Sequence, residues 1–289
     1  MAQPMTHRPA VPGTQSTLRE RARRLVPGAA RLFPPGRVAI IRLNGPIGGS
    51  ARTLELIELA KRLRESSHVP AVVLDVDSPG GSATASDELF IAFERLAAKK
   101  PLVACIRGTG ASGAYLAAVA ARRILANPNA IVGSIGVISA GPRLPRLLDR
   151  LGVTVAETKA GRLKGMGAPW REETDEERAK EQEVVDAIYG AFVGRVAKGR
   201  GMTEERVRDL ATGEIWLGER ALALGLVDEV GDLERAVEVA AAYAGVPAKS
   251  APVRVRRPFF GRLIERFATR LAGGVVDEIE ARLGDRFRA

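Results

Sequence analysis

Short apolar runs alternate with longer amphipathic segments along the middle of the chain, and this alternation constrains the fold more than any other feature. The runs are rich in Val, Leu and Ile and have the length of buried strands. They are expected at residues 38–43, 71–76, 102–106, 124–126, 132–138 and 153–158. Because strands that alternate with helices favour right-handed crossovers, the pattern predicts an α/β fold with a mostly parallel sheet.

The helical segments between and after these runs set the domain organisation. Helices are expected at residues 53–65, 85–98 and 175–198, after a Thr203 cap, and twice within 219–245. We expect one compact domain over residues 37–247. A basic mobile arm, residues 1–36, precedes it, and a basic amphipathic helical tail, residues 248–289, follows it.

Positive charge is concentrated at the two ends of the chain. The formal net charge is +10, of which residues 1–36 contribute +5 and residues 251–289 contribute +4, so the body is almost neutral. A nucleic-acid reader carries its charge on a folded face, so no nucleic-acid partner is expected. Basic ends instead suit peripheral contact with an anionic membrane. Since no signal peptide or membrane-spanning run is found, we expect a cytoplasmic protein, with peripheral contact on the inner face of the cell membrane.

Cysteine and histidine are scarce, and this limits the chemistry. Cys105 lies inside an apolar run and is expected to be a buried structural thiol. With only His7 and His68 in the chain, a metal site and a Ser-His-Asp triad are both disfavoured. If a serine is the nucleophile, its base must therefore be another residue type.

A serine occupies the turn between a strand and a helix in the stretch GTGASGAYLAAVAA, residues 108–121. Such a turn presents Ser112 outward as a nucleophile, or it simply allows a helix to pack closely on a sheet. The loop DSPGG, residues 77–81, ends the neighbouring strand. In a parallel sheet both loops lie at the same edge, where glycine N–H groups can stabilise an oxyanion. The pattern alone leaves both interpretations open.

A lysine is the candidate base. Lys164 lies in KAGRLKGMGAPW, residues 159–170, which is mostly small or apolar. Lysine ordinarily has a pKa near 10.4, but burial in an apolar site lowers the pKa of a lysine, and Ser-Lys pairs are a known variant of the nucleophile-base arrangement. A solvated surface charge is the alternative for Lys164.

Four motifs in order resemble the signal peptide peptidase A family of serine/lysine peptidases, also called protease IV. They are DSPGG at 77–81, GTGASGAYLAAVAARRILANPNAIVGSIGVI at 108–138, KAGRLKGMGAPWREETDEER at 159–178 and GEIWLGERALALGLVDEVGDLERAVEVAA at 213–241. The resemblance implies a ClpP/crotonase-like spiral of βαβ units. It also implies a nucleophile at Ser112, a general base at Lys164, a lysine-orienting residue at Ser134, and oxyanion-hole donors at Gly80 and Gly113.

The resemblance further implies a serine endopeptidase that acts through an acyl-enzyme on cleaved signal peptides or other unfolded or membrane-derived peptides. No cofactor or metal is implied, and the family assembles into ring- or bowl-like homo-oligomers with catalytic groups near subunit interfaces. The chain departs from the family in three respects. No transmembrane anchor is expected from its sequence, Ala114 stands where a second glycine is common, and Arg122 stands where an acidic residue is usual.

Two other functions remain open at this point. A crotonase-like enzyme acting on acyl-CoA would share the fold and the oxyanion hole, although no well-placed carboxylate pair is found near Ser112. A non-catalytic oligomeric scaffold associated with membranes would not need Ser112 at all.

Overall fold

A computed structural model describes residues 36–48 and 51–253 of the chain. The strands are β1 (Val38–Asn44), β2 (Val72–Ser78), β3 (Leu102–Ala111), β4 (Arg123–Ala126), β5 (Ile131–Gly133), β6 (Ile215–Leu217), β7 (Glu229–Val230) and β8 (Ser250–Pro252). The helices are α2 (Ala51–Glu65), α3 (Ala83–Ala97), α4 (Gly113–Val119), α5 (Pro145–Arg150), α6 (Asp175–Arg200), α7 (Glu204–Leu210), α8 (Gly218–Ala223) and α9 (Leu233–Ala244). The predictions of a basic arm before residue 36 and of a helical tail beyond residue 253 lie outside the described residues.

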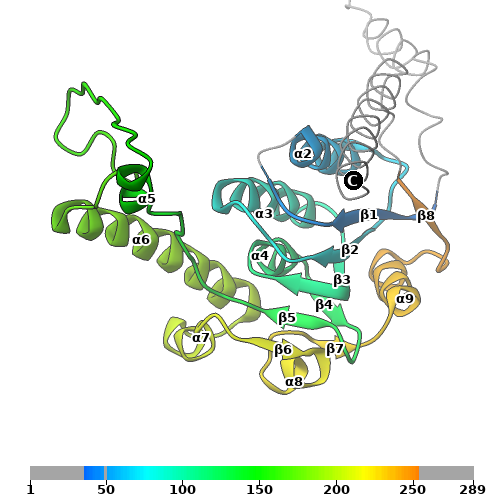
Figure 1. Ribbon diagram of the computed structural model, residues 1–289. Coiled ribbons are helices and arrows are strands. Elements are labelled where there is room, and N and C mark those ends of the chain that lie inside the picture. The colour runs from blue at the N-terminus through cyan, green and yellow to red at the C-terminus, as the bar shows by residue number, and fades with distance from the viewer. Residues whose placement is uncertain (1–35, 49–50, 254–289) are drawn as a thin grey trace, which may run out of the picture. The chain divides into compact units, whose positions relative to one another are not determined.

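The sheet has the strand order β6-β5-β3-β2-β1-β8, with β4 joined to β3 and β7 (Figure 1). All pairs are parallel except β5 with β6. The long strand β3 changes partner along its length, because Val103–Ile106 pairs with β4 and Thr109–Ala111 pairs with β5. The predicted α/β fold with a mostly parallel sheet is confirmed, and it has the form expected of the ClpP/crotonase-like class.

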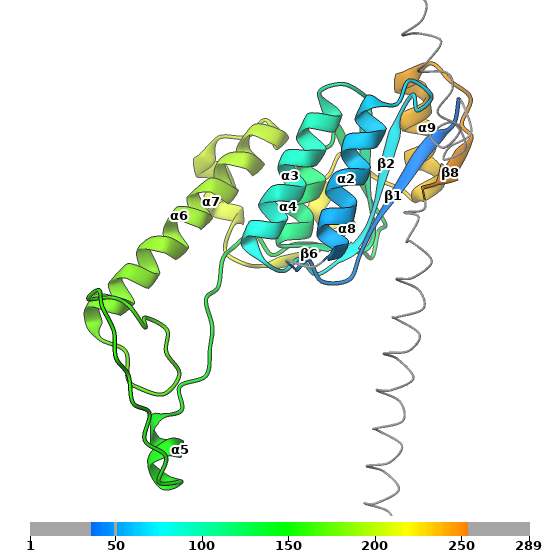
Figure 2. The same ribbon diagram turned by 90° about the horizontal axis from the view of Figure 1, so that it is seen from above.

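Helices cover both faces of the sheet (Figures 1 and 2). Helices α2, α3 and α4 lie side by side on one face, and α9 packs on the other. The α9 face is closed by apolar side chains such as Val73, Val103 and Ala240. Cys105 is fully buried in this layer, and burial raises the pKa of its thiol to about 12. The thiol therefore stays protonated at neutral pH, as a structural cysteine does.

Residues 139–174 leave the sheet and fold at the far end of α6, and we call this segment the projection (Figure 2). One prediction fails here and another just before it. No strand forms at 153–158, where Val153 and Val155 are 47% and 44% exposed, and the run at 132–138, which leads towards the projection, forms a strand only as far as Gly133. An apolar run becomes a strand only when it has a partner and a layer to cover it, and the projection offers neither.

The two substitutions that depart from the family are accommodated locally. Ala114 is fully buried inside α4 and has no positive φ, so a glycine is not required there. The Arg122 guanidinium lies 4.3 Å from the centroid of the Tyr243 ring, which belongs to α9. This cation–π contact joins the segment after α4 to α9. Among the helices of the described residues, none is long and apolar enough to cross a membrane.

Candidate active site

Ser112 lies at the junction of β3 and α4, where the backbone is strained. Its φ of 51° and ψ of −126° are unusual for a residue with a side chain. The Ser112 N–H donates to the Gly133 carbonyl at 2.8 Å, and the Ser112 carbonyl accepts from Leu116 at 3.0 Å. The strand ladder on one side and the first turn of α4 on the other therefore hold the turn. This is the geometry that presents a nucleophilic hydroxyl above the end of a sheet.

Ser134 is brought beside Ser112 by the register of the sheet. Ala111 and Gly133 are paired in β3 and β5, so the two serines follow neighbouring residues at the carboxyl ends of adjacent parallel strands. Ser134 also has a positive φ, 50°, and its N–H donates to the Glu214 carbonyl at 2.6 Å. The structure places the two serines next to each other, while the role of Ser134 in orienting a lysine stays a prediction.

Gly80 and Gly113 also lie together at this edge. A Cβ added to Gly80 would lie 2.7 Å from the Gly113 nitrogen and 2.9 Å from the Ser112 Cβ. The Gly80 φ of +88° and this close approach both require glycine. However, the Gly80 N–H donates to the Ser78 hydroxyl at 3.1 Å. As the structure stands, this N–H group is already used, and the predicted role of Gly80 as an oxyanion donor stays a prediction.

Gly81 is a donor that the sequence analysis did not name. Among the described residues, no acceptor pairs with the N–H groups of Gly81 and Gly113, and a Cβ on Gly113 would lie 3.7 Å from the Gly81 nitrogen. Two unpaired N–H groups side by side next to a serine can bind an oxyanion. Ser78 is the residue from which this donor could have been predicted. A serine hydroxyl can accept the N–H group two residues further on, here that of Gly80, and the N–H of Gly81 is then left free.

Lys164 is not brought to Ser112 within one chain. Its backbone N–H donates to the Gly161 carbonyl at 3.1 Å, inside a series of turns in the projection. The projection is attached to the first turn of α6, whereas Tyr189 donates to the Ala211 carbonyl of the body at 2.9 Å. Because an α-helix rises about 1.5 Å per residue, the start of α6 at Asp175 lies roughly 20 Å along the axis from Tyr189. Lys164 is exposed and belongs to this projection.

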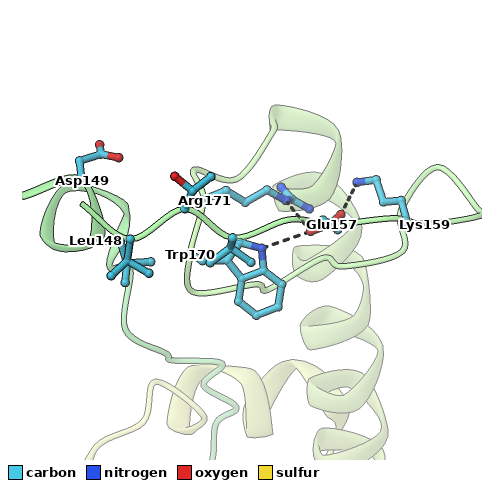
Figure 3. Close-up of a pocket in the computed structure, with 9 residues that line it drawn as sticks. Leu148, Asp149, Glu157, Lys159, Trp170 and Arg171 are labelled. Carbon is cyan, nitrogen blue, oxygen red and sulfur yellow. Dashed lines mark hydrogen bonds and ion pairs between the residues drawn. The ribbon is translucent and has the colours of Figure 1, made fainter. Parts of the chain in front are cut away.

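A pocket of about 320 Å³ opens on the projection (Figure 3). Its apolar lining includes Leu148 and Trp170, and its polar lining centres on Glu157. The Glu157 carboxylate accepts from the Trp170 indole at 3.2 Å and pairs with Lys159 at 3.1 Å. These bonds hold the pKa of Glu157 below its usual value, so the carboxylate is ionised at neutral pH. The pocket thus belongs to the charged network that shapes the projection.

A bidentate ion pair joins Arg171 of the projection to Glu177 of α6. The guanidinium donates to the two carboxylate oxygens at 2.5 and 2.8 Å, and the Glu177 side chain is only 4% exposed. Arg171 and the backbone of Thr174 lower the pKa of Glu177 from 4.5 to about 2. Bidentate pairing of this kind fixes both the distance and the orientation of the partners.

Acid is expected to weaken this pair only at low pH. A carboxylate whose pKa falls from 4.5 to about 2 on folding stabilises the fold fully above its unfolded value, and this stabilisation is lost as the pH falls towards the folded value. The difference in the free energy of unfolding between wild type and Glu177→Gln, measured by urea titration, should be constant from neutral pH to about pH 5 and shrink below about pH 4.5. An unchanged difference at about pH 3 would contradict this expectation.

A parallel α/β sheet that holds a strained serine beside unpaired N–H groups defines a serine hydrolase as the class of protein. Comparisons with known proteins agree. The model of Peptidase family S49 matches residues 94–247. A Synechocystis sp. protein with a provisional protease name is 38% identical over 210 residues, covering 73% of this chain and 75% of that protein.

Further relatives carry peptidase names. The chloroplastic serine protease SPPA of Arabidopsis thaliana is 35% identical over 215 residues, which cover 72% of this chain and 32% of that protein. Protease 4 of Haemophilus influenzae is 30% identical over 215 residues, with coverage of 71% and 34%. The chain thus spans about a third of the length of these two relatives. The chain belongs to peptidase family S49, and it is a serine peptidase.

Proposed function

We propose that this protein is an endopeptidase in which Ser112 is the nucleophile and Lys164 of a second copy is the general base. The observation that carries the first half is the strained Ser112 turn beside the unpaired N–H groups of Gly81 and Gly113. The second half is supported by the place of Lys164 in the projection, because the projection lies at the far end of α6 from α4, the helix that Ser112 precedes (Figure 2). The projection of one copy suits delivery of a base to another.

An uncovered apolar stripe on α6 supports the second copy. Val184, Ala187, Ile188 and Ala191 recur at the spacing of one helix face, and all four are exposed. Val184 and Ile188 are 45% and 37% exposed. Such a stripe on an extended helix suits burial against another protein surface, and a homo-oligomer of ring or bowl form would bury it.

The proposed chemistry follows from the groups at the edge of the sheet. Neutral Lys164 accepts the proton of the Ser112 hydroxyl, and the Ser112 oxygen attacks the carbonyl carbon of a peptide. The N–H groups of Gly81 and Gly113 stabilise the oxyanion, each worth about 3–4 kcal/mol in acyl transfer. The amine leaves with the proton from Lys164, and water then hydrolyses the acyl-enzyme. Ser134, next to Ser112, is suited to hold the arriving lysine by a hydrogen bond.

The substrates that we propose are cleaved signal peptides and other unfolded or membrane-derived peptides. An extended chain is required because the peptide carbonyl must reach a nucleophile that is only partly exposed at the edge of the sheet. A cytoplasmic location, with peripheral contact at the inner face of the membrane, is part of the same proposal. It rests on the charges of +5 and +4 in residues 1–36 and 251–289. The family relationship favours a peptidase over an acyl-CoA enzyme.

Covalent labelling tests the nucleophile. A fluorophosphonate loses fluoride when an activated serine oxygen attacks its phosphorus, so the wild type should gain one label per chain, detected by intact-mass spectrometry. Peptide mapping should locate the label on Ser112, and Ser112→Ala should remain unlabelled. Ser82→Ala, which changes a helix-capping serine of α3, is the matched control and should be labelled as the wild type is. Equal labelling of Ser112→Ala would overturn the assignment by placing the activated serine elsewhere, and a wild type that gains no label would favour a non-catalytic scaffold.

A further inference from the structure

Arg171 connects the loop of Lys164 to the start of α6. Besides its two bonds to Glu177, the guanidinium donates through Nη2 to the Gly165 carbonyl at 2.9 Å. Gly165 directly follows Lys164 in the chain. A single planar group therefore bonds at once to the backbone beside Lys164 and to a carboxylate on a long helix, which few other side chains can do.

Glu177 gives Arg171 a fixed partner. Its own backbone N–H donates to the Thr174 hydroxyl at 3.2 Å, and its carboxylate accepts from the Thr174 N–H at 3.0 Å. These reciprocal bonds form the capping box that begins α6, a helix of 26 residues. Glu177, whose carboxylate holds Arg171, is thus bonded to the start of a rigid helix through both its main chain and its side chain.

Apart from Arg171, the loop around Lys164 is joined to the start of α6 by an ion pair of Arg162 with Glu176, and exposed pairs of this kind contribute little to stability. Gly161 and Gly165 have φ values of +97° and +90°, and the internal bonds are turns such as Ala168 N–H to the Gly165 carbonyl at 3.1 Å. The Glu157 carboxylate packs against Gly165, where an added Cβ would lie 3.2 Å from its oxygen. A glycine-rich loop loses much conformational entropy when it is ordered, so the contacts of Arg171 decide where Lys164 is held.

We propose that Arg171 and Glu177 form a clamp that positions Lys164 for proton transfer, acting through the Gly165 carbonyl. This inference rests on the proposed function, in which Lys164 is the general base. The two clamp residues are positioning residues, because Arg171 bonds to the backbone beside the lysine and Glu177 holds Arg171, while neither is placed against the substrate. A displacement of about 1 Å in a reacting group can lower a rate about 100-fold, so a loose clamp is costly even when the fold is intact.

The test compares clamp variants with a matched ion pair that does not reach the loop. Glu177→Gln removes the charge at the same side-chain length and can still complete the capping box, and Arg171→Gln replaces the guanidinium with a shorter, uncharged polar side chain. Arg178→Gln is the control, because Arg178 pairs with Asp175 at 3.2 Å on the exposed side of the same first turn. Hydrolysis of an unstructured peptide rich in Ala and Leu gives kcat and KM for each protein.

We expect kcat to fall about 10- to 100-fold in both clamp variants with KM little changed, and to stay within about twofold in Arg178→Gln. Hydrogen exchange of the amides of residues 161–168 should accelerate in Arg171→Gln but not in Arg178→Gln. Light scattering checks that each variant keeps the wild-type assembly.

The outcomes separate the clamp from the proposed function. If Lys164→Ala is inactive while Arg171→Gln keeps wild-type kcat and exchange, the clamp is wrong and the base assignment stands. If Lys164→Ala keeps full activity, both are wrong. If Arg171→Gln loses activity only in proportion to lost assembly, with unchanged hydrogen exchange of residues 161–168, Arg171 has a purely structural role and the clamp is overturned.

Discussion

Mixing two inactive variants, Ser112→Ala and Lys164→Ala, is expected to restore about a quarter of the wild-type peptide hydrolysis per chain once subunits have exchanged. Each variant alone should lose about 1,000-fold or more of kcat/KM, because removing a nucleophile or its base removes the covalent route. In a mixed oligomer, the intact serine of one copy meets the intact lysine of another wherever the two kinds are suitably adjacent. The random chance of this pairing is about one in four.

Two controls make the mixing experiment decisive. A double variant, Ser112→Ala with Lys164→Ala, lacks both the serine and the lysine. It should therefore restore no peptide hydrolysis when it is mixed with either single variant. Ile188→Glu places a charge in the exposed stripe of α6 and should reduce both assembly and restored activity. If the single variants exchange subunits, as followed by fluorescence transfer, and stay inactive together, Lys164 does not act across copies.

Lys100→Met is expected to lower the free energy of unfolding by about 3 kcal/mol, the largest effect that we foresee for a residue outside the site. The Lys100 ammonium donates to the carbonyls of Leu63 at 2.5 Å, Val69 at 2.9 Å and Ser66, which close the end of α2 and the loop after it. A helix leaves its last carbonyls unpaired, and a cation there satisfies them and the helix dipole together. Methionine fills a similar volume but leaves these carbonyls without their donor.

Urea unfolding followed by circular dichroism measures this effect. Lys99→Met is the matched control, since the adjacent Lys99 is exposed, and it should change the free energy of unfolding by less than about 0.5 kcal/mol. Equal stabilities for the two variants would show that water replaces Lys100 at no cost. Burial lowers the pKa of Lys100, so the ammonium is held at an electrostatic cost that the three carbonyls must offset.

The sequence predicted best those elements that are stabilised by the sheet. The apolar runs that became β1, β2 and the first half of β3 were found because each is buried on both faces, which leaves a continuous hydrophobic signal. Helix α6 was found from its acidic first turn. The structure of the projection was not predicted, because its short helix α5 buries no residue and the apolar residues at 153–158 do not pair with another strand.

The residues of the candidate site also differ in how far the sequence could predict them. Ser112 was recognisable from a local pattern, because a strand, a small-residue turn and a helix are consecutive in the chain. Choosing between Gly80 and Gly81 needed the hydrogen bond from Gly80 to Ser78, which is a property of the folded loop. The separation of Lys164 from Ser112 depends on the direction in which α6 leaves the body, and a residue pattern carries no information about that direction.

The length of α6 gives this separation a physiological meaning. Under the proposed mechanism, a newly synthesised chain cannot bring its own Lys164 to its own Ser112, because α6 keeps the two residues apart. Such a chain is latent, and it cannot digest nascent polypeptides while it is dilute. Activity would rise more steeply than protein concentration, and the cell would control proteolysis through expression level without a propeptide or an inhibitor.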